Sequence, residues 1–589
     1  MLRRKIVGAM LVYAFLLPTT LLAQAPVYTA PKADIDKIKE EGLKHSQIMN
    51  TLNYLTNVIG QRLTASRNLK HANEWTRDTL TKFGLENSHL EAWGPFGRGW
   101  ELERFSAQVT SPYSFPVIAY PKAWSPGFGS QVIMPVPAAP AKGKKSKAAA
   151  AAPAAAPSTT ITADVVYFDA HDEAGLAKYK GQLKGKIVFM SGTRELKADL
   201  EGMGHRYTAQ ELLDMANSPD PDSVVRVAAA GAPNQANMEA RLKRFIDGLK
   251  RAKFVIDEGA AMVVDNSSKG SGGTIFVSGA SVSADIPANP MDFFTQKRLS
   301  AWDKEAEAKM VPQMTMATED YNRIVRMIQA GEKVQMTIDL KVRYLDDDPM
   351  VYNTIAEIPG SDPNLKDQVV MLGGHLDSWH SGTGATDNAA GVAVAMEAVR
   401  ILKAAGLKPR RTIRIALWTG EEQGLIGSRE YVTKHLGEMK GGRNIFGMPQ
   451  SGQQQKPELI KGAEYEKISA YYNLDNGTGK IRGVYMQGNE AARPYFRAWL
   501  TPFLDMGAAT LTLENTGGTD HLSFDRIGIP GFQFIQDEVE YDERTHHSNQ
   551  DVYDRIQADD MMQAATIMAA FVYQTAQMDE RFPRKPMSK

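Results

Sequence analysis

The sequence predicts an α/β protein in which helices flank a mainly parallel, mixed sheet, with a second, β-rich domain inserted into the main one. From Val351 onward, short apolar runs alternate with segments of helical periodicity, a rhythm typical of parallel strands covered by helices. The length of 589 residues exceeds what one hydrophobic core usually serves. We therefore expect two domains, of which one can interrupt the other.

Composition narrows the class of protein. Hydrophobic residues make up 43% and charged residues 23%, which is ordinary for a globular protein. Basic and acidic residues number 68 each, so the chain has no basic excess and nucleic acid is not an expected partner. The chain contains no cysteine, which excludes disulfides, thiol nucleophiles and cysteine-ligated zinc.

The N-terminus has the pattern of a signal peptide. The basic stretch Met1–Lys5 precedes an apolar run, Ile6–Leu22, and small Ala23 gives a cleavage point before Gln24. An uncleaved anchor is the alternative, although the run is short for a membrane span and contains Pro18. We expect residues 1–23 to be removed, no stable membrane insertion afterwards, and a secreted or periplasmic protein.

The segments between residues 24 and 345 predict two parts. Residues 24–110 belong to the main domain and carry two helices between Ile35 and Phe83, joined by the polar loop Gly60–Thr64. Residues 111–345 form the inserted domain, with a flexible Ala/Pro/Lys-rich segment at 135–160. Short apolar runs predict its strands at 163–168, 186–190, 261–264, 274–277 and 334–344.

The main domain continues over residues 346–580 and is followed by a tail, 581–589. Its strands are expected at 368–372, 411–418, 468–474 and 531–535, and its helices at 389–405, 427–436, 491–506 and 558–577. Ligands of open α/β sheets gather at the carboxyl ends of the strands, where the loops converge. The loops after these strands are therefore where function is expected.

Carboxylate and imidazole side chains follow these strands in order. Zinc takes imidazole nitrogen and carboxylate oxygen, and two neighbouring ions need a carboxylate that bridges them. The sequence therefore predicts a centre of two zinc ions. Its ligands are His375, Asp387, Glu422, Asp475 and one of the adjacent pair His546 and His547.

Two further acids have other expected roles. Asp377 lies two residues after His375, so on an extended segment its carboxylate can orient that imidazole. Glu421 precedes the ligand Glu422 and can act as the general base that activates water. Each motif alone also fits a capped turn, a helix N-terminus or a surface loop, but their order on successive strand ends favours a catalytic site.

Several motifs resemble the di-zinc exopeptidases of peptidase family 28, clan MH, which includes bacterial aminopeptidases and carboxypeptidase Q. The resemblance covers about Val351–Gln577. It rests on segments 374–379, 386–391, 418–424, 473–475, 518–521 and 546–548. It implies the phosphorylase/hydrolase-like fold of zinc peptidases and peptide substrates.

The resemblance also implies a role for each site residue. The family's histidine ligand directly precedes Ser or Thr, which selects His547 and leaves His546 as the fallback. The implied assignments are His375 and Asp475 on one zinc, Glu422 and His547 on the other, Asp387 as the bridge, and Glu421 as general base. The inserted segment resembles a protease-associated domain, and His521 is either a substrate contact or structural.

Alternatives remain open at this point. An aminopeptidase needs carboxylates for a free amine, whereas a carboxypeptidase Q-like enzyme needs a cation for the terminal carboxylate. Arg544 is either that cation or a solvated loop residue, and the aminopeptidase is favoured. A one-zinc glutaminyl cyclase and a non-catalytic receptor-like protein are further alternatives, both disfavoured because all five ligands are present. Side-chain preference and oligomeric state stay open.

Overall fold

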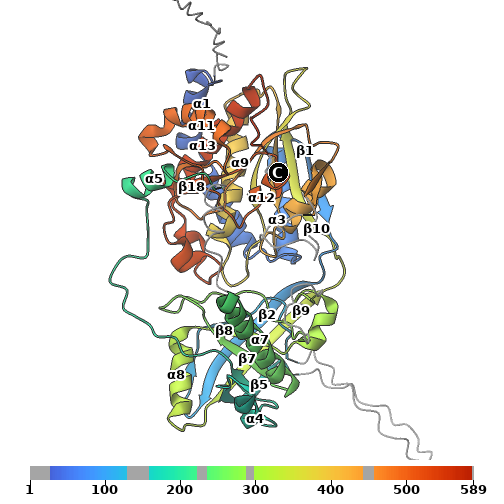
Figure 1. Cartoon of the computed structure of the whole chain (residues 1–589), viewed down its shortest axis with the longest axis vertical. Helices are drawn as coiled ribbons and strands as arrows, with labels where there is room; N and C mark the ends of the chain where they lie inside the picture. The colour runs from blue at the N-terminus through green and yellow to red at the C-terminus, as the bar shows by residue number, and fades with distance from the viewer. Residues whose placement is uncertain (1–26, 129–157, 222–234, 287–297, 442–456, 587–589) are drawn as a thin grey trace, which may run out of the picture.

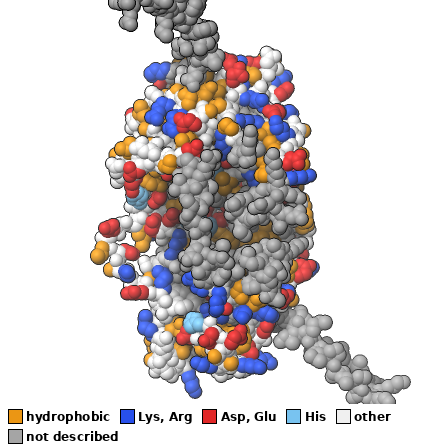
Figure 2. Space-filling model, viewed as in Figure 1, with side chains coloured by type: hydrophobic (Ala, Val, Ile, Leu, Met, Phe, Trp, Pro, Cys, Tyr) orange, Lys and Arg blue, Asp and Glu red, His pale blue; other side chains and the backbone are white. Residues whose placement is uncertain are grey.

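The computed structural model describes residues 27–128, 158–221, 235–286, 298–441 and 457–586. The predicted signal peptide, residues 1–23, lies outside the described residues, as does nearly all of the Ala/Pro/Lys-rich segment. Among the described helices, none combines the length and apolar character needed to cross a membrane. On the face shown in Figure 2, basic and acidic side chains are interspersed, in keeping with the balanced charge.

The described chain folds around two eight-stranded sheets, seen one above the other in Figure 1. Each sheet and the helices packed on it are called here the first and the second unit. The first sheet has the strand order β1-β10-β12-β11-β15-β18-β16-β17 and mixes parallel and antiparallel pairs. The α/β fold with a mixed sheet is confirmed. The strands of this sheet are β1 (Glu86–Trp93), β10 (Val351–Ile358), β11 (Val369–His375), β12 (Thr412–Trp418), β15 (Ile468–Asn473), β16 (Ile481–Tyr485), β17 (Thr510–Thr512) and β18 (Gly531–Gln536).

Helices cover both faces of the first sheet. One face packs against the almost wholly buried α9 (Ala390–Ala404) and α13 (Ala558–Gln577), together with α11 (Arg493–Leu500). The N-terminal helices α1 (Lys32–Lys44), α2 (Ile48–Asn53) and α3 (Arg67–Lys82) join the same core. The other face packs against α10 (Ile426–Tyr431) and α12 (His521–Asp525). The result is a three-layer arrangement with a large apolar core.

The second sheet has the order β3-β2-β9-β5-β6-β7-β8-β4. Helix α8 (Thr318–Gln329) packs on one face of it, and α7 (Gln235–Asp257) lies over the other. Strand β2 lies wholly in this sheet although it spans the predicted boundary at residue 110; the boundary itself stays a prediction. The strands are β2 (Gly99–Ser111), β3 (Phe115–Pro116), β4 (Ala119–Pro121), β5 (Thr160–Tyr167), β6 (Ile187–Phe189), β7 (Met262–Asn266), β8 (Gln313–Met316) and β9 (Gln335–Leu345).

One predicted strand is wrong. Segment 274–277 forms no regular ladder; Phe276 makes an isolated bridge with Ser548, and Val277 N donates to the carbonyl oxygen of His547 (3.1 Å). The side chains of Ile275 and Val277 are buried against Ala317 and Tyr120 of the second sheet's unit, so the apolar pattern reports burial rather than strand pairing. This segment therefore supports the loop that carries His547.

Candidate metal centre

The predicted site residues come from neighbouring strand ends. Strand β11 ends at His375, and β12, its parallel neighbour, ends at Trp418, directly paired with His375. Strand β15 pairs parallel with β11 on its other side and ends at Asn473, two residues before Asp475. Parallel strands end at the same edge of a sheet, so these loops meet there.

Asp387 lies in the turn that enters α9. Gly384, just before it, has φ +62°, and a Cβ there would lie 2.3 Å from the Cβ of Ser378, so only glycine fits this turn. The peptide bond between Asp387 and Asn388 is cis. The Asp387 carboxylate reaches the end of β11, where His375 lies.

Three side chains form a first cluster. His375 Nε2 lies 3.2 Å from Asp387 Oδ1 and 3.4 Å from Asp475 Oδ1. All three side chains are buried, with exposed fractions of 1% for His375, 5% for Asp387 and 7% for Asp475. They form one of the groupings in the described chain whose ligand atoms could hold a metal ion.

A second cluster shares Asp387. His547 Nε2 lies 3.2 Å from Asp387 Oδ2 and 2.9 Å from Glu422 Oε2. The two oxygens of Asp387 therefore face two different imidazoles. This is the arrangement that a carboxylate bridging two cations requires.

The residues fit a pair of zinc ions on two independent grounds. Ligand atoms about 2.1 Å from a tetrahedral zinc lie roughly 3.3 Å apart, close to the separations in both clusters. In addition, buried Glu422 Oε1 has no hydrogen-bond partner among the described residues, and Asp387 Oδ2 and Asp475 Oδ1 face the imidazole nitrogens named above. A buried carboxylate oxygen without a partner is costly unless a cation pairs with it.

The two adjacent histidines are not equivalent. His546 Nε2 lies 3.9 Å from Asp387 Oδ2, and its Nδ1 lies 3.5 Å from Asp542 Oδ1. His547 is nearer to two carboxylates and adopts φ +62°, a conformation that a non-glycine residue adopts at a cost. The geometry favours His547 over His546 as the ligand.

The charges of the site also favour bound cations. Burial raises the pKa of Glu422 to about 7, with the repulsion of Asp387 adding to the shift. Burial would lower the pKa of His375, but the neighbouring Asp475 and Glu421 outweigh it and raise that pKa well above its usual value. The site thus concentrates negative charge that cations would neutralise.

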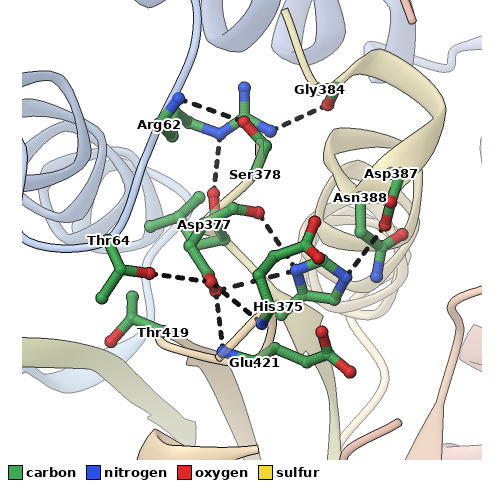
Figure 3. Close-up of polar contacts among 12 residues, drawn as sticks. Arg62, Thr64, His375, Asp377, Ser378, Gly384, Asp387, Asn388, Thr419 and Glu421 are labelled. Carbon is green, nitrogen blue, oxygen red and sulfur yellow. Dashed lines mark hydrogen bonds and ion pairs between the residues drawn. The ribbon is translucent and has the colours of Figure 1, made fainter. Parts of the chain in front are cut away.

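Asp377 contacts the site differently from the expectation. His375 Nδ1 lies 3.0 Å from the backbone carbonyl oxygen of Asp377, whereas the nearest carboxylate oxygen lies at 3.7 Å. Strand β11 ends at His375, so the extended geometry assumed for residue i+2 no longer holds. The carboxylate instead accepts from the backbone N–H groups of Glu421 and Glu422, at 3.3 Å each, and from Thr64 (Figure 3).

Glu421 has the environment expected of a base. Its side chain is buried, and burial together with Asp475 raises its pKa well above the usual value. The Asp377 carboxylate accepts from the backbone N–H groups of Glu421 and Glu422 and so fixes the turn that carries both side chains. A carboxylate with a raised pKa is a better proton acceptor near neutral pH.

Two positioning residues escaped the sequence analysis. Fully buried Arg62 donates to the carbonyl oxygens of Leu376 (2.7 Å) and Thr383 (2.8 Å). It also donates to that of Gly384 (2.8 Å; Figure 3), and so ties the two segments that carry His375 and Asp387. Arg62 lies in the stretch predicted only as a polar loop.

Asp551 is the second positioning residue that was not predicted from the sequence. Its carboxylate accepts from Thr386 N (2.6 Å), Thr386 Oγ1 (2.8 Å) and Asp387 N (3.2 Å). The only signal in the sequence is its place four residues after His547, which does not reveal a partner some 165 residues away.

Two residues with open roles lie away from the site's chemistry. His521 is fully buried and its Nε2 contacts Gln487 and the carbonyl oxygen of Thr516, which supports the structural alternative. Arg544 contacts Glu540 and Met203 and is absent from the lining of the adjoining cavity.

A cavity of about 280 Å³ opens beside the clusters. Asp475 and His546 line it on the side of the clusters, and Glu538 and Asp542 contribute two more carboxylates. Neither lysine nor arginine occurs among its lining residues, which also include Tyr207, Asn476, Tyr485, Thr516, Gly517, Gly518, Thr519, Gln536 and Tyr541. The cavity is therefore polar and acidic.

Comparisons with known proteins agree with this site. Residues 353–572 match the profile of Peptidase family M28. Mouse carboxypeptidase Q is 26% identical over 534 residues, which cover 90% of this chain and 86% of that protein. Rat carboxypeptidase Q is 30% identical over 275 residues, and there the match spans only about half of each protein, 46% and 52%.

A solved structure shares the overall architecture. The crystal structure of a Peptidase M28 precursor from Shewanella amazonensis SB2B matches with a TM-score of 0.59 and 21% identity, over 94% of this chain and 99% of that one. The fold and the family match define a metallopeptidase, a hydrolase of peptide bonds. Residues 353–572 are therefore a peptidase family M28 domain, and the protein is a metallo-exopeptidase.

Proposed function

We propose that this protein is an aminopeptidase that uses two zinc ions held by His375, Asp387, Glu422, Asp475 and His547. The observation that carries the proposal is the division of Asp387 between two imidazoles, with one oxygen 3.2 Å from each. His375 and Asp475 would hold one ion, Glu422 and His547 the other. Zinc bound there supplies Lewis-acid activation of water and of the scissile carbonyl group.

The chain's own residues account for the proton transfers. Glu421 takes a proton from the attacking water and returns it to the departing amine, so no enzyme nucleophile is needed. Asp377 orients Glu421 through the backbone rather than by touching substrate. Burial of His375, Asp387, Glu421 and Asp475 strengthens these electrostatic interactions.

The choice of substrate end follows from charge. A free α-amino group is a cation at neutral pH and needs carboxylates, whereas a terminal carboxylate needs a cation. The cavity that adjoins Asp475 offers Glu538 and Asp542, and its described lining contains neither lysine nor arginine. This supports recognition of the amino end.

A carboxypeptidase Q-like activity is the second candidate. It is favoured by the 26% identity to mouse carboxypeptidase Q over most of both chains. Arg544, the cation considered for a terminal carboxylate, contacts Glu540 and Met203 and so does not support this activity. The glutaminyl cyclase and receptor-like alternatives lack a favouring observation, because the described site retains ligands for two ions.

Hydrolysis of paired substrates tests the proposal. An unblocked aminoacyl anilide and an N-blocked dipeptide with a free carboxylate are offered to the zinc-loaded protein. We expect cleavage of the anilide and little cleavage of the blocked dipeptide. Cleavage of only the blocked dipeptide would replace the aminopeptidase by the carboxypeptidase.

We also propose export, with residues 1–23 removed as a signal peptide, and that the second unit is an inserted protease-associated domain. The apolar run after Met1–Lys5 supports export. N-terminal sequencing of the mature protein tests it: the expected first residue is Gln24, and an intact Met1 on the exported protein would contradict it.

A further inference from the structure

A segment of the second unit reaches across to the first. After β6 the chain leaves the second sheet, and residues 203–218, here called the arm, lie against the first unit (Figure 1). The arm includes α5 (Ala209–Ala216), which begins with a capping box from Thr208 to Glu211 and packs beside β17. The sequence of the arm itself therefore favours the start of this helix.

The arm is held by polar contacts with the end of β18. His205 and Val539 exchange both backbone hydrogen bonds, at 2.6 and 2.7 Å. Fully buried Asp537 accepts from Tyr207 N (3.0 Å) and from Arg206 (3.0 Å). Arg206 also pairs with Asp560 at 2.7 Å, so the arm is tied to two elements of the first unit.

Docking places one arm side chain in the cavity. Tyr207 lines the cavity beside the metal clusters, and its hydroxyl donates to Glu538 Oε1 at 3.0 Å. Burial and the nearby carboxylate raise the pKa of Tyr207, so the phenol stays protonated and keeps donating. A donor on one oxygen of Glu538 fixes the carboxylate and leaves its other oxygen for a ligand.

We infer that the arm is a specificity element, in which Tyr207 orients Glu538 to receive the free α-amino group of a peptide. The inference rests on the proposed aminopeptidase function and adds that the second unit supplies part of the substrate site. Tyr207 is a positioning residue, because it acts on the substrate through Glu538. The chemistry predicted is selectivity for peptides with an unblocked amino terminus.

Substitution of Tyr207 by phenylalanine tests the inference. Tyr207→Phe removes only the hydroxyl, so we expect KM for an unblocked aminoacyl anilide to rise roughly 3- to 10-fold. The value of kcat should stay within about twofold and zinc content should be unchanged, because no metal ligand is touched. The matched control is Tyr179→Phe, which removes a hydroxyl of the second unit that contacts the carbonyl oxygen of Tyr167.

A second variant tests the docking of the arm. Arg206→Met breaks the contacts with Asp537 and Asp560, and we expect the same rise in KM together with faster amide exchange at Val539. An unchanged KM in both variants, or an equal rise in the Tyr179→Phe control, overturns the inference while leaving the aminopeptidase intact. If the unaltered protein cleaves only N-blocked peptides, the inference and the proposed function fail together.

Discussion

Arg62 donates a 2.8 Å hydrogen bond to the carbonyl oxygen of Gly384, three residues before the carboxylate that faces both imidazoles. The pKa of this buried guanidinium is lowered by burial to about 10, so it stays charged at neutral pH. The nearby carboxylates of Asp551, Asp377 and Asp387 favour this charge, and the residue has a structural role beside the proposed metal site. Its contacts with carbonyl oxygens supply that role, because they fix the turn that presents Asp387.

Loss of Arg62 should weaken metal binding. In Arg62→Met the three carbonyl contacts disappear, and residues that orient ligands typically contribute 10- to 100-fold to metal affinity, so we expect a roughly 10- to 100-fold weaker zinc Kd. Competition with a chromogenic chelator measures it. Arg411→Met is the control, since Arg411 is equally buried and donates to the carbonyl oxygen of Met578, far from the site. Equal losses in both variants would reduce Arg62 to a general stabilising role.

Glu421→Gln should abolish most turnover without removing metal. The amide keeps the shape but cannot accept a proton, and general-base assistance contributes roughly 10²- to 10⁴-fold to kcat. Single-turnover hydrolysis and zinc analysis are measured on the same sample. Glu430→Gln, an exposed change in the adjacent helix α10, is the control. Near-normal turnover in Glu421→Gln would show that another group is the base.

The adjacent histidines should behave differently. His547 lies 2.9 Å from Glu422 and 3.2 Å from Asp387, so His547→Ala should lose one zinc ion per chain and most activity. His546→Ala should keep both ions, because its Nε2 lies at 3.9 Å from Asp387. Zinc per chain, measured after dialysis against the same free zinc concentration, distinguishes them. The reverse pattern would move the ligand assignment to His546.

His380 should make stability depend on pH. Its ring is buried and Nε2 lies 2.7 Å from the carbonyl oxygen of Pro121 in the second sheet, and burial lowers its pKa from 6.5 to about 4. Between these values the unfolded chain binds more protons than the folded one. The contribution of neutral His380, on the order of 3 kcal/mol, is therefore complete above about pH 6.5 and lost as pH falls to about 4.

Urea unfolding of His380→Gln checks this effect. Glutamine keeps an N–H donor for Pro121 but does not titrate. As the pH falls from about 7 to about 4.5, the variant should therefore lose less stability than the unaltered protein. The comparison between variants cancels the titration of the remaining carboxylates. Parallel losses in the two proteins would show that His380 is not the group responsible.

The parts of the fold that follow from local pattern were predictable. Runs such as 411–418 and 468–474 are apolar because β12 and β15 are central strands buried on both faces, and the helix at 389–405 shows the burial of α9 directly. The edge strand β1 has no such run, since most of its side chains are partly exposed. Segment 274–277 misled for the opposite reason, because its apolar side chains are buried against Ala317 and Tyr120 although its backbone has no ladder partners.

The candidate site likewise contains residues that could be predicted from the sequence and residues that could not. Asp387, Glu422 and Asp475 stand beside strand or helix ends that the sequence marks, so their convergence could be predicted. Arg62, Asp551 and Tyr207 act through backbone groups or side chains more than 160 residues away, and no local spacing encodes those partners. Asp377 shows the limit of period-2 reasoning, which fails once the strand has ended.

The most direct test of the two-zinc centre is anomalous diffraction at the zinc edge from crystals of the zinc-loaded protein. We expect two peaks per chain, one among His375, Asp387 and Asp475 and one among Asp387, Glu422 and His547. A single peak, or peaks away from Asp387, would contradict the two-zinc centre.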